Sequence, residues 1–336
     1  MKSINLSKRS LIILTLVTAV LLVVMLWLID VEAVSQTLQT ADARWLAVGT
    51  LFLFLGLAFF ALRWRLLMGN NPPFSVTYFA SSLANTANML TPSRLGEPLR
   101  IVMLGQATEV TYTEATTAFA VERLMEQIMR ALWFGLAILV GVRLDLSPVM
   151  VGTAVIGLIL AFAVGGWAIN HRETTLRVLP PQLARLPRLN EEQIRHSLGR
   201  TLDNLQAVAR PKQQILVWTW ALLAWGMYTL FYVAILMAIG YPAPDRLSAA
   251  LAAMALSPPT ATTMPGLYQA SVALPLSLLG FNAELLAAFS ILVQVLEIVW
   301  FGLLAILGLL RTGLSWQTIL ADESEVAAEI DEEFRG

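Results

Sequence analysis

The chain has 336 residues, of which 57% are hydrophobic and only 13% are charged, against roughly 25% charged residues in an ordinary soluble domain. The net charge of -1 says little about partners, but the absence of cysteine excludes disulfides, thiolate metal sites and cysteine nucleophiles. We therefore expect lipid to be the main solvent of this protein.

Long apolar stretches recur along the whole chain. A helix needs about 20 apolar residues to cross a bilayer, and six stretches are long enough. They are Leu11–Ile29, Trp45–Leu62, Ala115–Val142, Pro148–Ile169, Ile215–Gly240 and Leu285–Leu310. The first exceeds the roughly 7 to 15 residues of a signal-peptide core, so we expect it to remain as an uncleaved span.

The basic residues predict the orientation of these spans. With the N-terminus in the cytoplasm, the alternating spans place segment 170–213, with eight lysines and arginines, on the cytoplasmic side. Only Arg44, Arg143 and Arg246 are assigned outside, in agreement with the excess of basic residues in cytoplasmic loops. Arg63 is expected at the inner end of the second span. We predict a multi-pass protein of the plasma (cell) membrane with both termini in the cytoplasm.

Two segments outside the spans have their own character. Apolar residues recur at helical spacing within the basic loop, at Ile194, Leu198, Leu202, Leu205 and Ala209. This pattern fits a helix on the inner membrane surface or an ordinary solvated connector. Segment 312–336 is an acidic tail, which we expect to be solvated.

Two further stretches, 74–105 and 247–280, are interrupted rather than continuous. Each has apolar arms too short to cross a bilayer and a polar centre rich in Pro and Gly, at Thr91–Arg100 and Ser257–Gly266. Irregular backbone at membrane depth must be buried in protein or line a watery cavity. We therefore predict two re-entrant helical hairpins.

The chain also contains an internal repeat. Segment Glu114–Ala120 matches Glu284–Ser290 at a constant offset that also pairs Gln127 with Glu297. In each copy a span precedes a hairpin and another span follows, with opposite orientations. Inverted repeats of this kind are typical of secondary transporters. The predicted fold is an all-α integral membrane bundle with about six full spans and two re-entrant hairpins. Its membrane domain covers 1–311, with repeat halves at about 44–142 and 214–311.

A motif at the first hairpin carries a family resemblance. The segment from Asn88 to Arg100, with Pro92 four residues before the Gly96-Glu97 pair, is followed by Glu122 and Arg123. This pattern resembles the lysylphosphatidylglycerol synthase transmembrane region, a flippase-like membrane domain also related to archaeal lipid-linked sugar proteins. The resemblance implies a lipid flippase or a flippase-like role.

The resemblance also has limits. The later segment beginning Pro265-Gly266 resembles the family's second Pro-Gly segment, but Gln269 stands where the family often has an acidic residue. This departure puts ion coupling through position 269 in doubt. The chain ends soon after Arg311 without the aminoacyl-transferase domain of bifunctional relatives, so we do not expect synthase activity.

Charged residues inside spans are costly and usually face a cavity or a partner. Glu122, Glu126 and Arg130 lie on one face of the third span, where Glu126 and Arg130 are spaced so that they can pair directly. This face fits either a lining for a phosphate headgroup or a structural ion pair that joins helices. Glu297 could titrate during transport or form a hydrogen bond in the core.

Arginine near the first hairpin tip suits phosphate recognition, because its planar fork donates two hydrogen bonds to an anionic group. Positive-inside anchoring would also explain Arg94 and Arg100. The predicted substrate-binding residues are Asn88, Pro92, Arg94, Gly96, Glu97, Arg100, Glu122, Arg123, Glu126, Arg130, Pro265, Gly266, Gln269 and Glu297.

Three functions remain open from the sequence. The first is a flippase for a lipid with an anionic, phosphate-bearing headgroup; the second is a transporter of a small solute or ion. The third is a non-transporting membrane protein of envelope assembly. No nucleotide loop or metal motif is present in the sequence, and we expect neither enzyme activity nor a cofactor, a metal or a nucleic-acid partner.

Overall fold

The computed structural model describes residues 31–68, 72–90, 96–142, 167, 171–183, 195, 199, 211–256 and 266–313. Every regular element in these ranges is a helix. The predicted first span, nearly all of the predicted span 148–169 and most of the predicted surface helix lie outside the described residues. The acidic tail after position 313 also lies outside them.

Within the described residues, three helices are long and apolar enough to cross a membrane. They are α3 (Ala43–Leu67), α10 (Pro211–Ala238) and α13 (Ala283–Thr312). A fourth, α6 (Tyr112–Val140), has 29 residues and a length of about 44 Å, but it carries several charges. An all-helical membrane protein is therefore confirmed, while the count of six spans stays a prediction.

Helices α3 and α10 pack against each other in opposite directions. At one end the backbone N–H of Asp42 donates to the carbonyl of Ala238 at 2.8 Å, and at the other Gln213 Nε2 donates to the carbonyl of Leu66 at 2.6 Å. A Cβ added at Gly56 would lie only 3.1 Å from the ring of Tyr228. Glycine therefore allows the close approach of the two helices, as small residues do between membrane helices.

Each predicted hairpin is a pair of short helices in contact. The first pair is α4 (Phe74–Leu90) with α5 (Gly96–Ala107), and the second is α11 (Arg246–Leu256) with α12 (Leu267–Leu278). The tips, 91–95 and 257–265, lie outside the described residues. The helical arms are thus confirmed, and their re-entry into the membrane stays a prediction.

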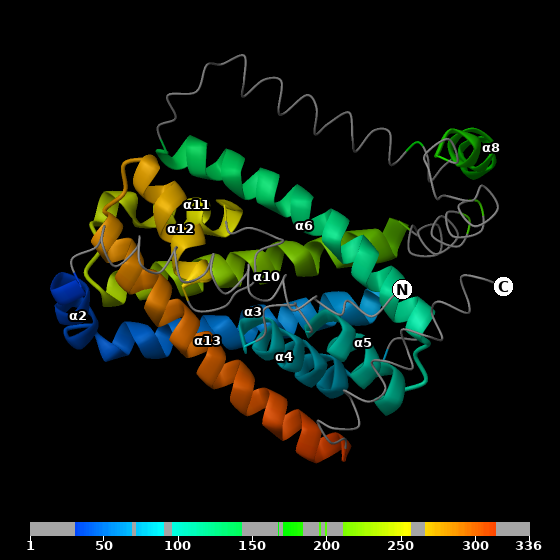
Figure 1. Cartoon of the computed structure of the whole chain (residues 1–336), viewed down its shortest axis with the longest axis horizontal. Helices are drawn as coiled ribbons and strands as arrows, with labels where there is room; N and C mark the ends of the chain where they lie inside the picture. The colour runs from blue at the N-terminus through cyan, green and yellow to red at the C-terminus, as the bar shows by residue number, and fades with distance from the viewer. Residues whose placement is uncertain are drawn as a thin grey trace, which may run out of the picture.

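The elements occur twice in the same order, a long helix, two short helices and a long helix. The first set is α3, α4, α5 and α6, and the second is α10, α11, α12 and α13. Helix α4 of the first set packs on α13 of the second, and α11 of the second packs on α6 of the first (Figure 1). The described chain is completed by α2 (Val31–Gln39), α8 (Arg172–Leu183) and a short 3-10 helix (Ala243–Asp245).

Candidate functional site

Arg63 of α3 is the first residue of a buried ionic network. Its side chain is completely buried, and Nη2 donates to Glu122 Oε1 at 2.6 Å. Arg63 lies near the end of α3, where the sequence placed it, but its side chain turns into the protein rather than toward solvent. Because it lies on the face of α3 that also carries Gly49 and Gly56, at intervals of seven residues, its side chain turns into the protein.

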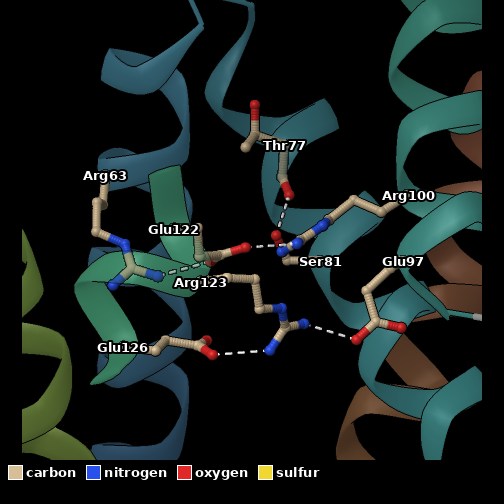
Figure 2. Close-up of polar contacts among 8 residues, drawn as sticks. All are labelled: Arg63, Thr77, Ser81, Glu97, Arg100, Glu122, Arg123 and Glu126. Carbon is tan, nitrogen blue, oxygen red and sulfur yellow. Dashed lines mark hydrogen bonds and ion pairs between the residues drawn. The ribbon is translucent and has the colours of Figure 1, made fainter. Parts of the chain in front are cut away.

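A second arginine binds the same carboxylate. Arg100 of α5, only 4% exposed, directs Nη2 to Glu122 Oε2 at 2.6 Å. Its guanidinium also lies over the ring of Trp64, 3.8 Å from the centroid, where a cation–π interaction adds to the ion pair. Glu122, on α6 and completely buried, therefore joins α3 and α5 through two arginines (Figure 2).

Arg123 joins two carboxylates in the reverse arrangement. Nη2 donates to Glu97 Oε1 of α5 at 2.6 Å, and Nη1 donates to Glu126 Oε2 at 2.7 Å. The structure therefore pairs Glu126 with Arg123 and not with Arg130, which the helical spacing also allowed. The guanidinium fork of Arg123 reaches both acids at once, whereas Arg130 directs Nη1 toward the carbonyl of Ala255 on α11 at 3.5 Å.

The start of α5 is held close to α4, which fixes the position of Glu97 and Arg100. The backbone N–H of Gly96 donates to Asn88 Oδ1 at 3.0 Å. A Cβ at Gly96 would overlap the carbonyl oxygen of Ala84, so only glycine allows this approach. Asn88 and Gly96 therefore shape the hairpin from which the site residues project.

The second hairpin forms a neutral cluster. Gly266 has φ 88°, in the left-handed region that favours glycine, and its N–H donates to Gln269 Oε1 at 2.6 Å. Gln269 Nε2 in turn donates to Gln294 Oε1 of α13 at 2.7 Å. Close by on α13, Glu297 is 9% exposed. This cluster contains no ion pair among the described residues.

The charges of the ionic network are balanced in total but unevenly placed. Two arginines share Glu122, and two glutamates share Arg123. Within the described residues, Arg63 Nε and Nη1 and Arg100 Nε have no hydrogen-bond partner. The end of the network around Glu122 thus combines an extra positive charge with unused N–H donors, which is the chemistry of an anion site.

The structure brings together five of the predicted residues in the ionic network: Glu97, Arg100, Glu122, Arg123 and Glu126. Gly266, Gln269 and Glu297 lie in the second cluster, and Arg130 points toward α11. Pro92, Arg94 and Pro265 lie outside the described residues. Sequence reasoning missed Arg63, although its spacing of seven from Gly56 was a usable signal for a shared helix face.

Comparisons with known proteins give one match. The family model described as the lysylphosphatidylglycerol synthase TM region matches residues 11–321. No curated protein and no solved structure matches the chain.

Proposed function

We propose that this chain, which belongs to the lysylphosphatidylglycerol synthase TM region family, is a flippase for a phosphate-bearing lipid of the plasma membrane. The family relates the chain to lipid or envelope processes in a membrane. The proposal goes further, to transport rather than catalysis and to a lipid with an anionic headgroup. The observation that carries it is the pair of buried arginines on Glu122.

The reason lies in the number of charges. A structural ion pair needs one arginine for one glutamate, and buried charge is costly unless it is paired. Glu122 is paired with two arginines. Three guanidinium nitrogens of Arg63 and Arg100 have no hydrogen-bond partner among the described residues. A phosphodiester would supply the missing negative charge and accept those N–H groups. Binding of such a headgroup therefore explains an arrangement that helix packing alone does not require.

We further infer that the two sets of four helices are inverted halves. The antiparallel packing of α3 on α10 supports this, as does the reciprocal packing of α4 on α13 and of α11 on α6. Two such halves provide two states, each open to one side of the membrane. With both termini in the cytoplasm, the first hairpin would open toward the cytoplasm and the second toward the outside.

The test is leaflet exchange in liposomes that contain the purified protein and a panel of labelled lipids. Arg63→Met leaves Glu122 paired with Arg100, so we expect a folded protein that has lost exchange of phosphate-bearing lipids. Arg44→Met changes an exposed arginine at the start of the same helix and should exchange like the wild type. Wild-type exchange rates in Arg63→Met would remove Arg63 from the mechanism, and wild-type protein that exchanges no lipid of the panel would refute the flippase.

A further inference from the structure

Glu297 is a buried acid that takes no part in the ionic network. It lies in the spanning helix α13 with 9% of its surface exposed. None of the described residues forms a hydrogen bond or an ion pair with its carboxyl group, in contrast to Glu97, Glu122 and Glu126. An ionised carboxyl group in the middle of a membrane costs about 2.5–3.5 kcal/mol on insertion scales, so an unpaired one needs an explanation.

The helix caps show which residue of the first half corresponds to Glu297. Thr111 accepts from the N–H of Glu114 at the start of α6, and Asn282 accepts from the N–H of Leu285 at the start of α13. Thr111 and Asn282 are 171 positions apart, whereas the match between the two sequence segments pairs residues that are 170 positions apart. Glu297 therefore corresponds to Glu126 and not, as the sequence alone suggested, to Gln127.

The same register explains why Glu297 has no cation. Glu126 is paired with Arg123, three residues before it, and the position of Arg123 is occupied in the second half by Gln294. The Oε1 atom of Gln294 accepts from Gln269 in the first turn of α12. The second half has thus kept the acid and its place on the helix but has a neutral amide in place of the arginine.

The groups that face Glu297 are neutral. Tyr228 and Tyr232 of α10 and Tyr268 of α12 lie near enough for its charge to act on them. The hydroxyls of Tyr232 and Tyr268 lie 3.0 Å apart in a hydrogen bond with each other. Such surroundings hold a protonated, neutral carboxyl group without the cost of an isolated charge.

Among the described residues, no charged group on a neighbouring helix forms an ion pair with Glu297. On α3, Arg63 pairs with Glu122, and on α6, Arg130 lies beside the ring of Trp225 and the carbonyl of Ala255. Helix α2 contributes the exposed Glu32, and α4 contributes the neutral Tyr78.

We propose that Glu297 binds and releases a proton in each transport cycle, which couples lipid movement to a proton gradient. The carboxyl O–H bond breaks when the site opens to water on one side, and the proton passes to that water. When the site opens to the other side, the carboxylate takes up a proton from the water there. The proposal rests on the proposed flippase function and adds its energy source.

The test uses the full-length protein in liposomes with an imposed pH gradient and a labelled phospholipid that the protein exchanges. If one proton moves with each lipid, a gradient of one pH unit sustains up to about a tenfold difference in lipid between the leaflets. We expect an asymmetry approaching this limit for the wild type and for Glu284→Gln, which alters an exposed acid in the first turn of α13. Glu297→Gln should leave the lipid evenly distributed.

A second measurement covers the case in which Glu297→Gln does not transport at all. Infrared spectra of the purified protein should contain a protonated-carboxyl band that is sensitive to deuterium exchange and absent from Glu297→Gln. A wild type without this band, lipid distribution that ignores the pH gradient, or a response to a sodium gradient instead would overturn the proposal. If the band is present but the wild type exchanges no lipid, the flippase function fails and the proton site stands.

Discussion

Neutralising Glu122 should separate the stability of the ionic network from its function. Glu122→Gln keeps the shape of the side chain but removes the carboxylate that pairs with both Arg63 and Arg100. Glu109→Gln is the matched control, because Glu109 is an exposed acid in the loop before α6. The two variants make the same chemical change a short distance apart along the chain.

The magnitude follows from the two ion pairs. Opposite charges about 4 Å apart attract by about 4 kcal/mol at an effective dielectric constant of about 20. Part of this attraction offsets the cost of removing the charges from water, and experiments on buried pairs give about 3–5 kcal/mol when one partner is removed. The variant also leaves two buried arginines that repel each other. We therefore expect the free energy of unfolding to fall by about 3–5 kcal/mol, against at most about 0.5 kcal/mol for Glu109→Gln.

Thermal unfolding of the purified protein in mild detergent measures this difference. A loss of about 3–5 kcal/mol corresponds to a fall in Tm of about 10 °C. Arg63→Met should behave differently and keep a Tm near that of the wild type, because one arginine still neutralises Glu122. Equal Tm values for Glu122→Gln and Glu109→Gln would refute the reasoning. A fall in Tm for Arg63→Met as large as that for Glu122→Gln would show that both arginines are structural.

Two further predictions concern the hairpins. Gly96→Ala forces a Cβ against the carbonyl of Ala84, so it should destabilise the protein by about 1–3 kcal/mol and slow lipid exchange. Gly135→Ala is the control, because no atom lies within 4 Å of the added Cβ, and it should change neither stability nor exchange. Tm and exchange rates measured on both variants check this, and equal values would contradict the close packing of α5 on α4. Ser93→Cys should react with an impermeant thiol reagent from the cytoplasmic side and Gln269→Cys from outside. Because the chain has no native cysteine, labelling of both from one side would count against inverted halves.

The sequence predicted the helical arms well because local signals determine them. The apolar arms of stretch 74–105 correspond to α4 and α5, and α5 ends at Ala107. The arms of stretch 247–280 correspond to α11 and α12. The predicted span Ala115–Val142 corresponds to α6, and the capping pair of Thr111 with Glu114, a further local signal, marks the start of this helix. Length, apolar character and capping are properties of neighbouring residues, so a single sequence contains them.

The partners in the site could not be predicted in the same way. Glu126 has arginines at both i−3 and i+4, and helical spacing allows either pair. Glu97 of α5 decides between them, because it draws Arg123 into a position where one guanidinium reaches two acids. Arg63 was missed for a related reason, since its spacing from Gly56 indicates a shared helix face, but the packing of α3 against its neighbours shows that this face turns inward. Partner choice depends on tertiary contacts between segments far apart in the sequence.

The packing between the two halves gives a physical route from the anion site to the proton site. Helix α4, which carries the first hairpin, packs on α13 so closely that a Cβ at Gly308 would lie 2.5 Å from the Cβ of Phe79. Packed interfaces shift as units rather than deform continuously. If the first hairpin moves when a headgroup binds Arg100, α13 must therefore move with α4 or the contact between the two helices must repack. Glu297 lies on α13, three turns before this contact. We infer that occupation of the anion site and exposure of Glu297 to water are linked through the contact between α4 and α13, which is the condition that coupled transport requires.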